Sequence, residues 1–142
     1  MITLATTSAG NLQSRAHRTV RAFMGRSLRP HRVSATGWAF LGVVAKTQGV
    51  RPSEIADELG VQRPMVTQLT REFESRGLVA SVADPTDTRA KQIILTPHGQ
   101  KFVEMLELKL RQELGGFLSD VPVEELATYF RVLRKIANKL EN

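Results

Sequence analysis

Cysteine is absent from the 142 residues of the sequence. Its absence excludes a disulfide framework, thiolate catalysis, a cysteine-type zinc site and a sensor that works by cysteine oxidation. Long apolar runs are also missing, because none reaches the roughly 18 to 20 residues that a membrane-spanning helix needs. We therefore expect one domain, residues 1–142, that acts in the cytoplasm without a membrane partner.

Acidic residues are missing from the first 53 positions, where eight Lys and Arg residues occur. The remaining chain holds twelve basic and fourteen acidic side chains, so charges of +8 and −2 give the net charge of +6. A region of one charge sign attracts polyanions such as nucleic acid or anionic lipid. The alternative is that the basic surface only keeps the protein soluble.

Motifs for catalysis are missing as well. The three histidines, His17, His31 and His98, stand apart from one another. There is no His-Glu-x-x-His motif, no nucleophile elbow and no phosphate-binding loop. Isolated histidines of this kind are usually surface residues or helix caps, so we expect no enzymatic activity, no bound metal and no cofactor.

The acid-free N-terminal segment has the composition of an organelle transit peptide, but it also has helical spacing. Leu12, Ala16, Val20 and Phe23 recur at intervals of three or four residues, and Pro30 would end a helix. We favour a structural helix over residues 8–29, with a targeting signal as the alternative.

Caps and apolar spacings predict five further helices and one hairpin. Ser34 and Thr96 are good N-caps, and Gly115–Gly116 is expected to break the helix that begins at Pro97. The predicted helices cover residues 35–46, 52–59, 63–76, 97–114 and 122–140. Two β-prone runs, residues 77–82 and 91–95, flank a charged loop at residues 83–90. The predicted fold class is therefore mainly α with a small β-hairpin.

Residues 52–73 have the pattern of a helix-turn-helix, in which the second helix enters the DNA major groove. Gly60 permits a left-handed turn between the two helices, and the small Ala56 lets them approach. The residues expected to face inward are Ile55, Ala56 and Leu59 in the first helix and Val66, Leu69 and Phe73 in the second. A purely structural helical hairpin is the alternative.

The opposite face of the second helix predicts DNA contacts. Pro64, Thr67, Gln68 and Arg71 fall at i, i+3, i+4 and i+7, and Arg63 projects from the first turn. Arg can read guanine, Gln can read adenine, and Thr can contact a phosphate or the thymine methyl group. An ordinary solvated helix face is the alternative, although such a face more often mixes both charge signs.

The hairpin after this helix predicts a wing, and its loop is longer than a hairpin needs. Arg89 is the candidate for a DNA minor groove, and Lys91 for a phosphate. Asp87 lies two residues before Arg89, so in extended backbone both side chains fall on one side and the carboxylate can hold the guanidinium. The alternative is a surface ion pair of at most about 1 kcal/mol.

With these elements, the sequence resembles the MarR-type (multiple antibiotic resistance regulator) winged-helix transcription factors over nearly its whole length. The most specific motif is "DPTDTRAKQIILTPHG", which is similar to the family's wing and the Leu-Thr-x-x-Gly start of its next helix. "PSEIADELGV", "REFESRGLV" and "GWAFLGVVA" are similar to other family segments. The resemblance implies a winged-helix core at residues 34–95 and dimerisation helices at residues 8–29 and 97–140.

The sequence departs from the family at four positions. Gln62, Met65 and Gln68 stand where the family commonly has Ser, Thr and Arg, and Arg51 stands where a Thr cap is usual. The operator therefore cannot be taken from relatives.

The wide apolar faces of the terminal helices predict a twofold homodimer that sets two recognition helices about 34 Å apart. The first helix is basic and the late helices are acidic, so these helices are expected to attract each other. The residues concerned are Arg15, Arg18 and Arg21, and Glu104, Glu107, Glu124 and Glu125. The competing interpretation is that the arginines contact DNA directly.

The resemblance also implies a small aromatic effector, bound between the dimerisation helices and the winged helix. Candidate lining residues are His17, Arg21, Phe23 and Trp38, although Phe23 and Trp38 are also well suited to a plain core. The predicted function is a cytoplasmic, sequence-specific, double-stranded DNA-binding regulator, a repressor released by its effector. The alternative is a winged-helix protein-interaction module, or a regulator with little sequence specificity.

Overall fold

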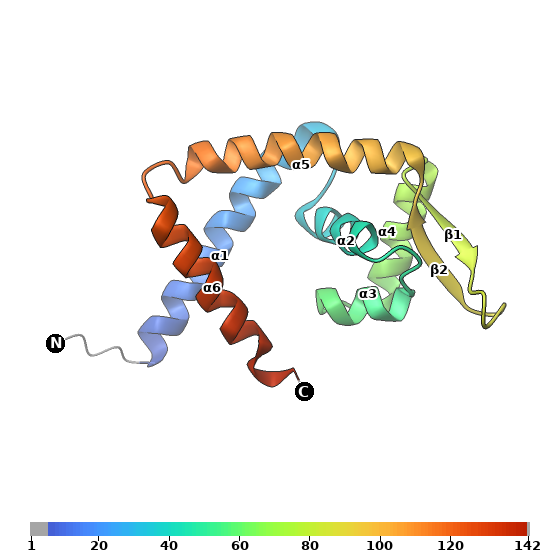
Figure 1. Cartoon of the computed structure of the whole chain (residues 1–142), viewed down its shortest axis with the longest axis horizontal. Coiled ribbons are helices and arrows are strands. Elements are labelled where there is room, and N and C mark those ends of the chain that lie inside the picture. The colour runs from blue at the N-terminus through green and yellow to red at the C-terminus, as the bar shows by residue number, and fades with distance from the viewer. Residues whose placement is uncertain (1–5, 142) are drawn as a thin grey trace. The chain divides into compact units, whose positions relative to one another are not determined.

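The computed structural model describes residues 6–141, which form helices and one antiparallel hairpin (Figure 1). The helices are α1 (Thr6–Leu28), α2 (Ala35–Lys46), α3 (Pro52–Leu59), α4 (Arg63–Ser75), α5 (Pro97–Phe117) and α6 (Val123–Ala137), with short 3-10 helices η1 (Arg29–His31) and η2 (Asn138–Leu140). The strands are β1 (Val79–Ala83) and β2 (Lys91–Leu95). The prediction of a mainly helical winged helix-turn-helix is confirmed.

The chain forms two compact units, residues 1–110 and residues 111–142, so that α5 contributes to both. Within the described residues, no helix combines the length and the apolar character needed to cross a membrane.

The start of α2 and the end of α3 lie at residues that the sequence predicts as helix boundaries. The Ser34 hydroxyl accepts a hydrogen bond from the Gly37 amide at 2.9 Å, which caps α2. Gly60 ends α3 in the left-handed region, with φ of 64°. The helical hairpin of α3 and α4 therefore turns where the sequence predicts it.

The core of the first unit lies where α2, α3, α4 and the hairpin meet. Ile55 and Ala56 of α3 and Val66, Leu69 and Phe73 of α4 are buried, which confirms the inward face predicted for each helix, apart from the half-buried Leu59. The Phe73 ring stacks on the Phe40 ring of α2, with 5.6 Å between centroids. Leu28, Leu106 and Leu110 extend this core to the end of α1 and into α5.

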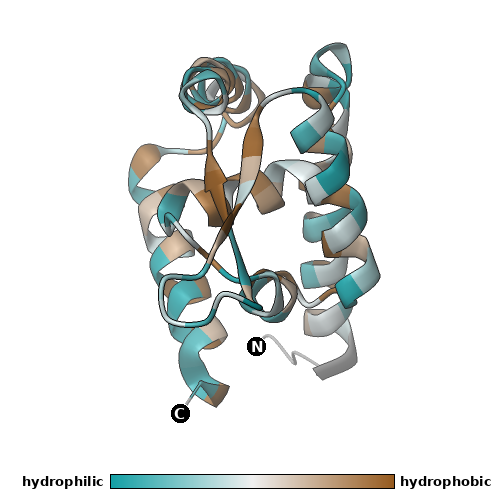
Figure 2. Cartoon of the chain, turned by 90° about the vertical axis from the view of Figure 1, so that its right-hand side faces the viewer, coloured by the Kyte–Doolittle hydropathy of each residue, from teal (hydrophilic) through white to brown (hydrophobic). Residues whose placement is uncertain are grey.

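The two strands pair from Val79 with Leu95 to Ala83 with Lys91, and Val50 adds a single bridge to Ile93. The prediction that Ala83 begins the loop is wrong, because Ala83 pairs with Lys91 and is the last residue of β1. Figure 2 shows that hydrophobic residues occupy the base of both strands, whereas the connecting loop is mostly hydrophilic.

The start of α5 explains the Leu-Thr-x-x-Gly motif. The Thr96 hydroxyl donates to the Gly77 carbonyl at 2.6 Å and accepts from the Gly99 amide at 2.9 Å. A β-carbon on Gly99 would fall well inside van der Waals contact with the Leu78 carbonyl oxygen. A glycine is therefore required where the helix crosses the backbone that leaves α4.

The expected break at Gly115–Gly116 is wrong, because α5 continues through both residues to Phe117. Each glycine costs roughly 1 kcal/mol relative to alanine in a helix, which weakens a helix without forbidding it. The amide of Leu118 still donates to the Leu114 carbonyl at 2.9 Å, so the hydrogen-bond ladder passes the glycines.

In the second unit, α6 presents an apolar face to solvent. Tyr129, Phe130, Val132 and Ile136 are all exposed, and the rings of Tyr129 and Phe130 lie 5.6 Å apart. In the first unit, the side chains of residues 8–22 of α1 are exposed, with Leu12 at 63%.

Candidate nucleic-acid interface

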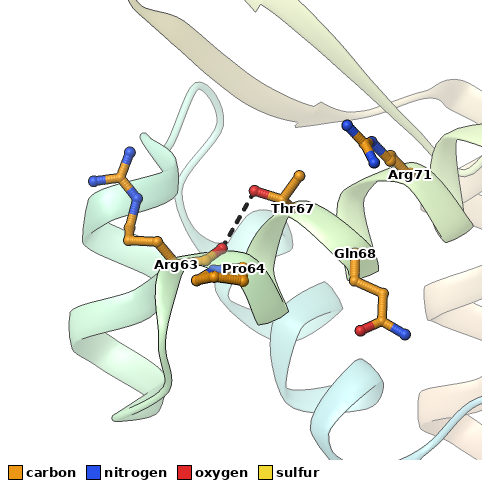
Figure 3. A pocket seen from close by; sticks show the side chains of 5 residues that line it. All are labelled: Arg63, Pro64, Thr67, Gln68 and Arg71. Carbon is orange, nitrogen blue, oxygen red and sulfur yellow. Dashed lines mark hydrogen bonds between the residues drawn. The ribbon is translucent and has the colours of Figure 1, made fainter.

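The outward face of α4 forms an open groove of about 540 Å³. Because Val66, Leu69 and Phe73 hold one side of this helix in the core, the opposite side must face solvent. The residues that line the groove are Arg63, Pro64, Thr67, Gln68 and Arg71, all five of the contacts predicted on this helix (Figure 3). The structure therefore brings the predicted residues together on one accessible surface.

Two of the five side chains that line the groove are arginines, and none of the five is acidic. Arg63 and Arg71 lie toward opposite ends of it, with Gln68 between them in sequence (Figure 3). The first turn of α4 contains no acid, so the partial positive charge of the helix N-terminus is not neutralised there. The Thr67 hydroxyl donates to the Arg63 carbonyl at 3.3 Å, which orients its oxygen lone pairs and its methyl group.

A second groove, of about 300 Å³, runs between α4 and the hairpin. Thr67 and Arg71 line it from the helix, and Lys91 lines it from the start of β2. The Glu74 carboxylate also borders this groove and accepts a hydrogen bond from the Ser81 hydroxyl at 2.6 Å. Lys91 is thus placed beside the residues of α4, as expected for a basic contact next to a recognition helix.

The wing loop, residues 84–90, consists of two consecutive Asx turns. Asp84 Oδ1 accepts from the amide of Thr86 at 2.8 Å and from its hydroxyl at 2.7 Å. Asp87 Oδ1 accepts from the amide of Arg89 at 3.1 Å and from its Nε at 3.3 Å. The predicted contact of Asp87 with Arg89 is present, but the extended backbone assumed for it is wrong, because a turn brings the two side chains together.

Sequence reasoning missed a contact between Arg51 and Asp84. Arg51 Nη2 and Nε lie 2.7 and 3.0 Å from Asp84 Oδ2, and the Asp84 side chain is only 2% exposed. Hydrogen bonds from the Thr86 hydroxyl and amide, followed by the Arg51 guanidinium, hold the pKa of Asp84 well below its usual range, although burial acts in the opposite direction. The one signal in the sequence is that Arg51, whose side chain has no oxygen to cap a helix, stands directly before α3.

The four residues predicted to line an effector site lie on α1 and α2. His17 is exposed, and Arg21 Nη2 donates to the Thr36 hydroxyl at 2.8 Å, which links the two helices. Phe23 is half-buried, and Trp38 is half-buried against the core.

Comparisons with known proteins point to one family. A family model described as the MarR family matches residues 33–90. The chain is similar to a MarR-family transcriptional regulator from Rhodococcus sp. RHA1, with 22% identity, 97% and 99% of the two chains covered, and a TM-score of 0.85. It is similar to the transcriptional regulator PA3341, with 30% identity, coverage of 94% and 98%, and a TM-score of 0.79.

The chain is also similar to CouR from Rhodococcus jostii RHA1. The identity is 25%, 99% of each chain is covered, and the TM-score is 0.81. That protein was crystallised with p-coumaroyl-CoA bound.

Proposed function

The chain belongs to the MarR family of transcriptional regulators, and on that premise we propose that it binds double-stranded DNA sequence-specifically as a homodimer. The observation that carries the proposal is the groove on α4, where two arginines, a glutamine and a threonine gather on one accessible face. These are the side chains that read base edges and phosphates in the major groove.

The roles follow from the chemistry of each side chain. Arg63 and Arg71 would contact guanine or phosphate, and Gln68 would contact adenine. Thr67 would contact a thymine methyl group through its own methyl group, or a phosphate after its hydroxyl turns away from the Arg63 carbonyl. Pro64 would make an apolar contact beside Arg63, at the N-terminal end of the same face.

The wing would make the second set of contacts. Arg89, whose side chain is 91% exposed, would enter the minor groove, where a narrow groove has enhanced negative potential. Asp87 would orient the guanidinium of Arg89, and Lys91 would contact a phosphate. The groove that Lys91 shares with Thr67 and Arg71 supports one continuous surface across α4 and the hairpin.

The exposed apolar residues of α6 and the exposed face of α1 support the homodimer, because a large apolar patch in water marks an interface. A twofold axis would place the two α4 helices about 34 Å apart, one turn of DNA, and the bound dimer would block transcription from its promoter. We place this repressor in the cytoplasm.

A small aromatic effector would release the DNA by binding near His17, Arg21, Phe23 and Trp38. The contact of Arg21 with Thr36 supports this region, since a ligand there would act on both α1 and α2. The relative that binds p-coumaroyl-CoA supports an aromatic acyl compound as the class of effector.

The experiment that tests DNA recognition is the selection of bound fragments from random duplex DNA at a stated salt concentration. An enriched inverted repeat with half-sites one helical turn apart is the expected result. Salt-sensitive binding without any enriched sequence would contradict sequence-specific DNA recognition. That result would favour a winged-helix module that binds another protein, or a regulator with little sequence specificity.

A further inference from the structure

We propose that Arg51 and Asp84 form an anchor that positions the wing loop against the helix-turn-helix, so that the DNA contact of Arg89 depends on Arg51. The proposal rests on the proposed function, because it concerns how the same DNA-binding surface is held. Arg51 and Asp84 would act as positioning residues, without touching DNA themselves.

The anchor is built on a carboxylate whose two oxygens both have partners. Asp84 Oδ2 receives Arg51 Nη2 at 2.7 Å, Arg51 Nε at 3.0 Å and Gln92 Nε2 at 3.3 Å. Asp84 Oδ1 receives the two hydrogen bonds from Thr86. A carboxylate exposed by only 2% is strongly unfavourable without such partners, so this set of contacts fixes where Asp84 can lie.

The position of the anchor joins two distant parts of the first unit. Asp84 directly follows β1, and its amide donates to the Ala90 carbonyl at 3.1 Å, which closes the base of the loop. Arg51 directly precedes α3 and follows Val50, which bridges to Ile93 of β2. The contact therefore fastens the base of the wing to the point where the chain enters the helix-turn-helix.

The two Asx turns carry the effect of the anchor to Arg89. The first turn spans residues 84–86 and the second spans residues 87–89, so no spacer lies between them. The amide of Ala90 donates to the Asp87 carbonyl at 3.0 Å and closes the second turn on the loop base. Because the Arg89 side chain is exposed, its position depends on the backbone turns beneath it, and these begin at Asp84.

The Arg51 side chain contacts Asp84 and does not cap α3. Arg51 occupies the N-cap position of α3, yet its side chain makes no cap hydrogen bond. Threonine is a strongly preferred N-cap residue and cannot reach a carboxylate as a guanidinium does. Arg51→Thr therefore removes the anchor while supplying a helix cap, which makes it a better variant than alanine.

The first test measures the wing without DNA. Because the chain has no cysteine, nitroxide labels can be attached at Glu58→Cys on α3 and Thr88→Cys in the loop. Electron spin resonance gives the distance distribution between the labels, with labelled protein diluted in unlabelled protein to suppress distances between subunits. We expect a narrow distribution with Arg51, one at least twice as wide with Arg51→Thr, and an intermediate one with Arg51→Lys. Arg29→Ala, at an exposed arginine of η1, is the control that should not change it.

The second test is a double-mutant cycle on the duplex recovered by selection. Arg89→Ala should weaken binding about tenfold when Arg51 is present and less than twofold in the Arg51→Thr background. Arg51→Lys should restore part of the Arg89 effect, and circular dichroism checks that each variant is folded.

The outcomes separate this proposal from the proposed function. If no variant, wild type included, binds duplex DNA, the proposed function fails and the label distances alone decide the anchor. Equal widths with Arg51 and Arg51→Thr overturn the anchor. So does an Arg89→Ala effect of the same size in both backgrounds.

Discussion

Replacing Gly99 by alanine tests the close approach of α5 to the backbone that leaves α4. The added β-carbon would overlap the Leu78 carbonyl oxygen, which is backbone and cannot rotate away. That carbonyl also accepts the hydrogen bond of the Thr96 amide at 3.1 Å, so moving it would disturb the cap of α5. The substitution should therefore strain the joint that connects the hairpin to α5.

The magnitude follows from three contributions. Overpacking costs about 1 to 3 kcal/mol, and weakening the Thr96 hydrogen bond costs about 1 kcal/mol more. Alanine returns at most about 1 kcal/mol of helix propensity relative to glycine. We expect a net loss of about 2 kcal/mol of unfolding free energy, measured by urea titration with circular dichroism at 222 nm and a fixed protein concentration.

Gly115 and Gly116 provide a matched control in the same helix. A β-carbon at either position would have nothing within 4 Å, so Gly115→Ala and Gly116→Ala should each stabilise the protein by about 0.5 to 1 kcal/mol. The same substitution is thus expected to change stability in opposite directions at the two ends of α5. If Gly99→Ala is as stable as Gly115→Ala, the reasoning about the joint is refuted.

Three further predictions concern charge. Arg71→Ala should weaken binding to the selected duplex by about 1 to 3 kcal/mol and flatten the salt dependence, as fluorescence anisotropy at several salt concentrations would reveal; an unchanged affinity would exclude Arg71 from the interface. The folded protein holds the pKa of Asp84 below its unfolded value, so the stability gained from its ionised form is present above about pH 4 and is lost as the pH falls further. The urea midpoint of wild type should therefore exceed that of Asp84→Asn at neutral pH, and the gap should shrink below about pH 4; a gap that is constant with pH would contradict this. Arg18→Glu combined with Arg21→Glu should weaken dimerisation at low salt in sedimentation experiments, whereas an intact dimer with a shallower salt slope for DNA would assign these arginines to DNA contact.

Local sequence signals predicted most of the fold because they act over a few residues. Ser34 and Thr96 cap their helices through amides three residues later, and the inward stripe of α4 follows the helical repeat. The outward stripe is the same repeat seen from the other side, which is why the five residues of the α4 groove could be named in advance.

These local signals do not predict contacts between residues that are distant in the sequence. Arg51 and Asp84 are 33 positions apart and neither belongs to an apolar repeat, so nothing in the sequence pairs them. The turn that brings Asp87 to Arg89 depends on two side-chain oxygens that fold the loop, and strand spacing does not describe it. The prediction for the end of α5 is wrong because each glycine costs a helix only about 1 kcal/mol, and α5 is already long before it reaches Gly115 and Gly116.

The missing side-chain cap of α3 affects the order in which segments of the folded protein unfold locally. A helix with its own N-cap can persist while distant segments open, but the start of α3 is held by a residue whose partner follows β1. The first helix of the helix-turn-helix and the hairpin should therefore open together as one cooperative unit. The Ile55 amide of α3 donates to the Arg51 carbonyl at 3.1 Å and so is protected from exchange in the folded state. In native-state hydrogen exchange, this amide should exchange with the same opening free energy as the amides of β1, rather than with that of α4.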